Sequence, residues 1–338
     1  MFKKARVPLE NTRPHVLWTL STATPAAIPE FVFDGDAPYN IPADALRASL
    51  TCPNGTPNSN DKPVLLVHGT GSTGNESWGR GFVPALAETG MKACFTNLRE
   101  TEDTANSALV AFLAADLFLL FSKSIYVGRP IAAIGHSQGS PNIQWALRFF
   151  PSTRNADVTR AFIAMSPDFA GVGFDGIAAF CDIIDGVRFC TPSLWQQAAG
   201  SNFMKALNGG SHGINRAYVP TTIVWSRTDE IVVPPYQNSR LSGAVMIAAQ
   251  DLCPLRVVGH LLMTIDAAGF AIALDALNND GHANVSRIDE SVCRNFLAPG
   301  MNPTLASLTE AGTNDIVKGF LLGGPKTKEE PALLPYAV

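Results

Sequence analysis

A serine between two glycines follows directly on a short apolar run. The motif Gly135-His136-Ser137-Gln138-Gly139 comes after Pro130–Ile134 and before residues that favour a helix. A strand, a sharp turn and a helix in this order are typical of a nucleophile elbow, in which the glycines let strand and helix approach each other. We therefore predict that Ser137 is a nucleophile in acyl transfer. A second match, Gly209–Gly213 around Ser211, has no apolar strand before it, and we interpret it as a surface loop.

A serine needs a base at neutral pH, usually a histidine that is oriented by a carboxylate. On folds with such an elbow the chain order is serine, acid, histidine. We predict Asp229 as the acid because it follows the strand-like run Thr221–Ser226, and His260 as the base because it follows Leu255–Val258. The adjacent Glu230 is expected to point away. The other acids and histidines come too early, lie in polar loops or are not at strand ends: His212, His282, Asp168, Asp251 and Asp266.

The loop His68–Gly71 follows the apolar run Pro63–Val67 and is the candidate oxyanion site. Acyl transfer develops a negative charge on oxygen, which preorganised N–H donors stabilise. We expect these donors to be the backbone N–H groups of Gln138 and Thr70. No lysine follows in the position that a phosphate-binding loop requires. A metal site is disfavoured as well, because the cysteines show no CxxC spacing and the histidines are not at ligand spacing.

These residues lie on apolar runs that alternate with helical stretches. Such alternation is typical of a mostly parallel sheet with helices on both faces, so we expect one α/β domain over residues 1–338. Residues 1–62 are rich in proline and are expected to form an irregular N-terminal wrap. The predicted strands are residues 63–67, 93–96, 130–134, 161–165, 221–226 and 255–258, and the predicted helices are residues 42–50, 82–88, 106–124 and 143–150.

Composition excludes several classes of protein. The chain has 338 residues, of which 46% are hydrophobic and 16% are charged, and its net charge is −4. These values argue against disorder, a coiled coil and a nucleic-acid partner. The longest apolar stretch, Ala108–Phe121, is too short to span a membrane and contains Asp116. The basic N-terminus is not followed by an apolar segment long enough for a signal peptide.

Several longer stretches carry a more specific signal. LTCPNGTPNSNDKPVLLVHGTGSTG, MSPDFAG, PSLWQQAAGS, VPTTIVWSRTDEIV and VVGH resemble the fungal lipase B family of α/β-hydrolases. The resemblance covers about residues 44–336. It implies the same triad and oxyanion residues, with the hydroxyl of Thr70 as an additional donor. It also implies that the substrate contacts His136, Asp168 and Ile231, and that no cofactor is needed.

The chain departs from the family pattern at three places. His136 stands where the family has a bulky tryptophan, so we expect a wider and wetter alcohol pocket. The insertion at residues 171–195 is longer and apolar, and is expected to be either a disulfide-tied lid or a surface helix on the core. Glu329 replaces a family cysteine. Of the 15 pairings that six cysteines allow, the resemblance implies Cys52–Cys94 and Cys253–Cys293, which leaves Cys181–Cys190.

The sequence thus favours a secreted serine ester hydrolase, a monomeric lipase that acts at a lipid–water interface. Disulfides and the sequons at Asn54, Asn75 and Asn284 are compatible with secretion, although Asn75 lies close to the oxyanion loop. One alternative is an esterase or acyltransferase for short or bulky soluble esters, and the insertion decides between the two. Another is a binding protein without catalysis, which the complete triad disfavours.

Overall fold

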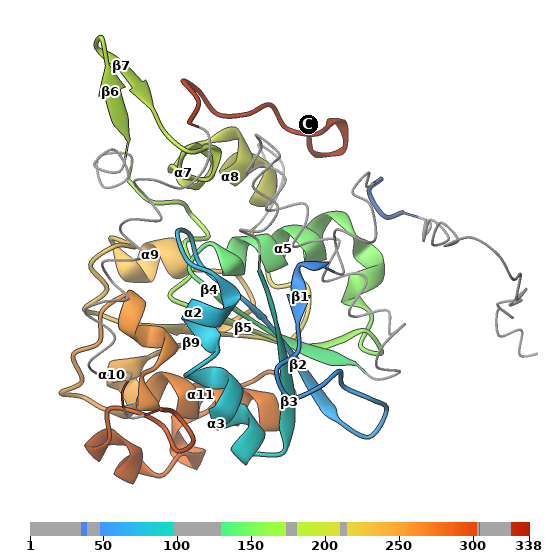
Figure 1. The fold of residues 1–338 in the computed structure, drawn as a ribbon, viewed down its shortest axis with the longest axis vertical. Coiled ribbons are helices and arrows are strands. Elements are labelled where there is room, and N and C mark those ends of the chain that lie inside the picture. Colours follow the sequence, from blue (N-terminus) through green and yellow to red (C-terminus); the bar gives the residue numbers. More distant parts are fainter. Residues whose placement is uncertain are drawn as a thin grey trace, which may run out of the picture. The chain divides into compact units, whose positions relative to one another are not determined.

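A seven-stranded sheet forms the centre of the molecule (Figure 1). The computed structural model describes residues 35–38, 48–97, 130–173, 181–209, 215–302, 304 and 326–338, which all belong to the unit Val32–Val338. Strands pair in parallel except at one edge, where β1 is antiparallel to β3. In spatial order the strands are β1 (Leu50–Thr51), β3 (Met91–Thr96), β2 (Lys62–Val67), β4 (Ile131–His136), β5 (Thr159–Met165), β8 (Thr221–Trp225) and β9 (Val245–Ala248).

Helices cover both faces of this sheet (Figure 1). Along β2, Val64 and Leu66 pack into one core cluster, and Leu65 and Val67 pack into the other. A strand buried on both faces reads as a continuous apolar run, which is why the sequence pattern located it. One face carries α2 (Gly74–Trp78), α3 (Phe82–Glu88), α10 (Ala249–Leu252) and α11 (Ala267–Asn278), and the other carries α5 (Gly139–Phe149) and α8 (Asn202–Leu207).

The prediction of a strand over residues 255–258 is wrong, and the last strand of the sheet is β9 instead. Leu255 is 97% exposed and Val257 is 76% exposed, so this apolar run is not buried on a sheet. The carbonyl of Val258 accepts a hydrogen bond from the hydroxyl of Ser226 at 2.6 Å rather than from a neighbouring strand. The predicted helix 106–124 and most of the helix 42–50 lie outside the described residues.

The insertion contains a small hairpin that projects away from the sheet (Figure 1). Its strands are β6 (Asp182–Ile184) and β7 (Val187–Phe189), and a disulfide between Cys181 and Cys190 closes its base. The described part of the insertion is therefore a hairpin followed by α7 (Pro192–Gln197), and no surface helix occupies residues 181–190. The hairpin exposes apolar side chains: Ile183 (65%), Ile184 (56%) and Val187 (41%).

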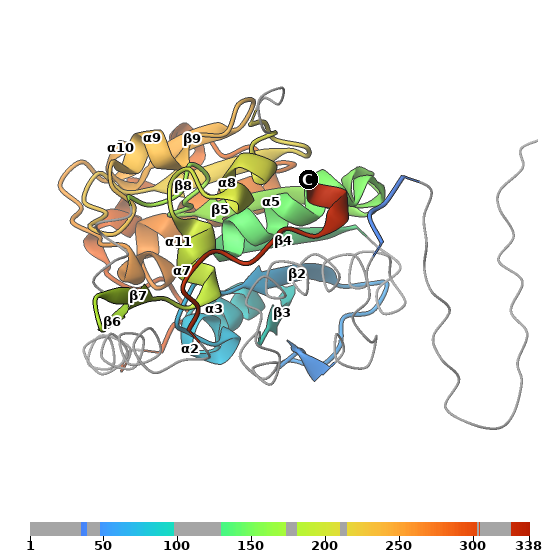
Figure 2. The ribbon, with the colours of Figure 1, turned by 90° about the horizontal axis from the view of Figure 1, so that it is seen from above.

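The C-terminal residues run past α7 to α5 (Figure 2). Thr327 exchanges backbone hydrogen bonds with Cys190, and Tyr336 accepts a hydrogen bond from the indole of Trp145. Two further disulfides join Cys52 to Cys94 and Cys253 to Cys293, so the cysteines pair as the family resemblance implies. Among the described residues, no helix is long and apolar enough to cross a membrane.

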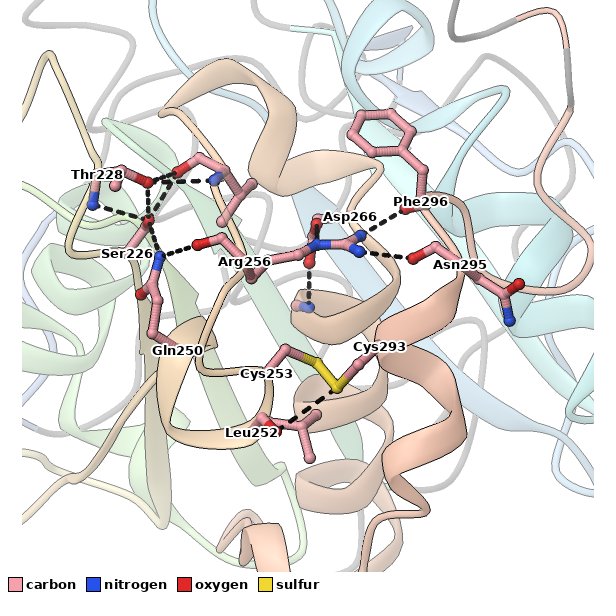
Figure 3. Close-up of polar contacts among 12 residues, drawn as sticks. Ser226, Thr228, Gln250, Leu252, Cys253, Arg256, Asp266, Cys293, Asn295 and Phe296 are labelled. Atoms are coloured by element: carbon pink, nitrogen blue, oxygen red, sulfur yellow. Dashed lines mark hydrogen bonds and ion pairs between the residues drawn. A yellow bond between two sulfur atoms is a disulfide. The ribbon is translucent and has the colours of Figure 1, made fainter.

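Arg256 holds the loop between α10 and α11 in place (Figure 3). Its Nε donates to Oδ2 of Asp266 at 2.6 Å, and its terminal nitrogens donate to the backbone carbonyls of Asn295 and Phe296. Asp266 is fully buried and also caps α11 by accepting from the N–H of Gly269 at 2.8 Å. Removing one partner of a buried ion pair leaves the other charge uncompensated, which is costly. The conformation of this loop therefore depends on the guanidinium of Arg256.

We predict that Arg256→Gln lowers the free energy of unfolding by about 3 kcal/mol, because it leaves the buried carboxylate of Asp266 without its charged partner. Arg227→Gln is the matched control, since Arg227 is half exposed and pairs with the exposed Asp251. Its loss should stay below about 1 kcal/mol. Urea unfolding of both variants measures the difference. Equal losses would show that the buried Arg256–Asp266 pair contributes no more to stability than the exposed Arg227–Asp251 pair.

Candidate active site

Ser137 occupies the sharp turn between β4 and α5. Its φ angle is 51°, in the left-handed region, and its backbone N–H donates to the carbonyl of Met165 at 3.0 Å. A Cβ atom at Gly139 would lie 2.2 Å from the carbonyl oxygen of Val67, and one at Gly135 would lie 2.7 Å from the backbone of Gly139. Only glycine fits at these two positions. The close approach of strand and helix therefore explains why glycines flank Ser137 at this spacing.

Asp229 and His260 meet across two loops. Asp229 follows β8, and His260 lies between α10 and α11. His260 Nδ1 is 2.9 Å from Oδ2 and 3.1 Å from Oδ1 of Asp229. A carboxylate only accepts, so Nδ1 carries a proton, and in the neutral ring Nε2 is then the proton acceptor. The Oδ1 atom of Asp229 also accepts from the backbone N–H groups of Ile231 and Val232, at 3.0 and 2.9 Å.

These contacts keep Asp229 ionised. Burial by itself raises the pKa of this carboxyl group, but the hydrogen bond and charge of His260 and the two backbone donors lower it further than burial raises it. The net pKa lies below the usual value for aspartate. The pair therefore combines a carboxylate with a ring whose Nδ1–H is held toward it, which is the arrangement that stabilises an imidazolium when a base takes a proton.

His136 links the elbow to the loop of His260. Its ring is only 4% exposed and lies 4.9 Å from the ring of His260, between centroids. Its Nε2 donates to the backbone carbonyl of His260 at 2.9 Å. The structure buries this residue, as it does Ser137 and His260, and uses the ring N–H inside the protein. Because Ser137 is the next residue, this contact brings the serine and histidine segments together.

The prediction that Glu230 points away from the site is wrong. Its Oε2 accepts a hydrogen bond from the backbone N–H of His260 at 3.0 Å. Gly259 leaves room for this contact, since a Cβ atom there would lie 2.6 Å from the same oxygen. Sequence alone offered no signal for it, because the contact depends on how two loops meet. His282 lies on the exposed surface, and Ser211 and His212 lie outside the described residues.

Thr70 lies between two glutamine side chains. Its hydroxyl oxygen is 2.6 Å from Oε1 of Gln138 and 3.0 Å from Oε1 of Gln197. The single hydroxyl proton can serve one strong acceptor at a time. Gln197 ends α7 and donates from its own Nε2 to the carbonyl of Ser193 at 3.0 Å. The structure therefore brings together both predicted oxyanion residues and adds Gln197, which was part of a quoted motif but received no role from the sequence.

Asp168 follows β5 and is fully buried. Neither of its carboxylate oxygens has a hydrogen-bond partner in another described residue. Burial raises the pKa of Asp168 to about 7; the charge of Asp229 acts in the same direction and that of His260 against it. Asp168 thus titrates near neutral pH within the electrostatic reach of the Asp229–His260 pair.

We predict that Asp168 makes the protein less stable as pH rises. Between about pH 4 and 7 the folded protein keeps a proton on Asp168 that the unfolded chain has released, so the free energy of unfolding falls across this window. Asp168→Asn stays neutral at every pH. Its free energy of unfolding relative to wild type should therefore increase by on the order of 2 kcal/mol between about pH 5 and about pH 8.

Urea unfolding at both pH values measures this gain. Asp289→Asn is the control, because Asp289 is exposed and the backbone N–H of Ser291 lowers its pKa, which places its titration below the window. A difference between wild type and Asp168→Asn that does not change with pH would contradict the assignment of a raised pKa.

Comparison with known proteins agrees with this geometry. The chain is 31% identical over 341 residues to lipase B of Pseudozyma antarctica, and the alignment covers 95% of this chain and 92% of that protein. It also superimposes on the crystal structure of Aspergillus fumigatus lipase B with a TM-score of 0.79 and 31% identity, over 92% of this chain and 76% of that one. No protein-family model matches the chain. The similarity in sequence and fold over nearly the whole chain shows that this protein belongs to the fungal lipase B family of α/β-hydrolases.

Proposed function

We propose that the protein is a secreted triacylglycerol lipase that works through an acyl-enzyme. Family membership makes it a carboxylic-ester hydrolase. The observation that carries the proposal is the hydrogen bond from His260 Nδ1 to Asp229, made beside the strained turn of Ser137. In the neutral ring it leaves Nε2 unprotonated, which is what a serine nucleophile requires of its base.

In the proposed reaction the hydroxyl of Ser137 attacks the ester carbonyl while His260 Nε2 takes its proton. Asp229 stays ionised and stabilises the imidazolium that forms. His260 then gives the proton to the leaving alkoxide, which leaves an acyl group on Ser137. A water molecule repeats the sequence: His260 removes its proton, and the oxygen attacks the acyl carbonyl. His260 then gives this proton to the oxygen of Ser137 as the bond to the acyl group breaks, which releases the acid and restores the free serine.

The oxyanion is stabilised by the backbone N–H groups of Gln138 and Thr70 and by the hydroxyl of Thr70. Gln138 stands at the N-terminal end of α5, where the helix dipole also favours a negative charge. The Thr70 hydroxyl lies within hydrogen-bond distance of the amide oxygens of Gln138 and Gln197 and donates to one of them at a time. During the reaction this hydroxyl turns to the oxyanion. Donors of this kind contribute several kcal/mol to the transition state.

Ester substrates at a lipid–water interface fit the exposed hairpin. Ile183 and Ile184 are more than half exposed on β6, next to the helix that carries Gln197. Exposed apolar side chains of this kind are costly in water and are typical of surfaces that contact lipid or protein. We expect the protein to bind this interface transiently and as a monomer, with no cofactor. His136, Asp168 and Ile231 are proposed to border the substrate.

Two features support secretion. The disulfides join all six cysteines of the chain, and such bonds persist in oxidising compartments. The sequons at Asn54, Asn75 and Asn284 all lie on the exposed surface. An asparagine in such a position is accessible to glycosylation, which occurs on secreted proteins.

We predict that Ser137→Ala lowers kcat for p-nitrophenyl butyrate by at least about 10⁴-fold, because the nucleophile is lost. The matched control is Ser211→Ala, in the second glycine–serine motif, which should keep the wild-type rate. Initial rates of p-nitrophenol release measure both. If the effects of the two variants were reversed, the elbow at Ser137 would not be the site of acylation.

A second measurement separates a lipase from an esterase. We expect the hydrolysis rate of long-chain p-nitrophenyl esters to rise steeply once the substrate exceeds its aggregation limit, because the exposed hairpin then contacts a lipid surface. The measurement uses acyl chains from acetyl to palmitoyl, each below and above that limit. Activity confined to short soluble esters, without a rise, would establish an esterase and leave the hairpin as a fixed wall.

A further inference from the structure

We propose that His136 is a positioning residue that sets the place of the catalytic base through its backbone. The inference rests on the proposed function, since it assumes that His260 is the base. Its carrying observation is the hydrogen bond from His136 Nε2–H to the carbonyl of His260, at 2.9 Å. A carbonyl oxygen only accepts, so Nε2 must be the protonated nitrogen.

His136 is well placed to act as a rigid donor. It is the last residue of β4, a strand whose six residues are all buried between β2 and β5. Its ring is 96% buried, and the indole of Trp78 packs edge-on against it with 6.4 Å between ring centroids. A side chain confined in this way has little freedom left to lose, so its N–H fixes its acceptor well. The same strand presents Ser137, so one element sets both partners.

His260, in contrast, lies in a loop and needs support from side chains. The preceding run is not a strand, and Val257 in it is 76% exposed. Three side chains hold the residue at three different atoms. Asp229 accepts from the ring Nδ1, Glu230 accepts from the backbone N–H, and His136 donates to the carbonyl. Of the three, only His136 belongs to the central sheet, so it ties the loop to the strand that carries the nucleophile.

The ring of His136 stays neutral while it does this. Burial lowers its pKa to about 3, and the charges of His260 and His68 lower it as well. The hydrogen bond to the backbone of His260 and the charge of Asp229 act in the opposite direction. The residue therefore supplies an N–H without adding a positive charge beside the imidazolium that forms on His260. A charged donor at this place would oppose protonation of the base, since like charges disfavour each other.

The test compares two variants of nearly equal size. Gln at position 136 places an amide N–H close to where histidine has Nε2–H, whereas Met fills the same length without a donor. For His136→Met we expect kcat for p-nitrophenyl butyrate to fall about tenfold, a larger change than any in KM, because a misplaced base slows the chemical step. His136→Gln should restore most of this loss. His282→Met, at an exposed histidine, is the control and should leave kcat unchanged.

The pH profile adds a readout that a purely structural role would not move. A looser His260 bonds less well to Asp229, and the lost carboxylate contact lowers the pKa of the base. The acid limb of kcat/KM should therefore move to lower pH in His136→Met but not in His136→Gln. Equal losses of kcat in the two variants, or no loss in either, would overturn the proposal. So would a change confined to KM, which would make His136 a wall of the pocket only.

Two measurements keep these outcomes interpretable. Titration with a p-nitrophenyl phosphonate, which labels the reactive serine once, counts the folded active molecules and corrects kcat for any misfolded fraction. Ser137→Ala tests the proposed function separately. If that variant remained active, the triad itself would be wrong. If it were inactive and the two His136 variants matched wild type, only the positioning role would fail.

Discussion

The first turn of α5 packs directly on the end of β2, and no side chain fits between them. A Cβ atom at Gly139 would lie 2.2 Å from the carbonyl of Val67, so the helix can approach only because this position is glycine. The close approach requires a left-handed conformation at Ser137, and it places the N-terminus of α5 directly after this residue. Such strain persists only where the surrounding structure fixes it, and here the buried sheet does so.

The rest of the site is built on loops that side chains hold to this core. Arg256 anchors the loop of His260 to the start of α11, while His136 ties it to β4. Glu230 and Asp229 hold the same residue from the loop after β8. Loops carry function because a rigid scaffold can position them, and in this protein the scaffold acts through a small number of buried hydrogen bonds.

Electrostatics inside this site depends on burial. Asp229 stays ionised because donors surround it, whereas Asp168, without such donors, has a pKa near 7. His136 is neutral for the same reason that Asp168 resists ionisation: a charge without a partner is costly in the interior. The two buried aspartates therefore differ in pKa, and Asp229, whose pKa is lowered, is the one that contacts the ring of His260.

The sequence alone predicted a mostly parallel sheet and the glycine-flanked turn at Ser137, and it singled out Asp229 and His260, whose side chains meet in the structure. Continuous apolar runs reveal strands that are buried on both faces, and glycine spacing reveals a close approach of backbone. Only the tertiary structure decided that the last strand is β9 rather than residues 255–258, that Glu230 turns back to His260, and that Gln197 joins Thr70. It also decided that His136 donates its N–H to the backbone carbonyl of His260. Local patterns record which residues are buried, but contacts between loops far apart in the chain depend on how the packed elements bring those loops together.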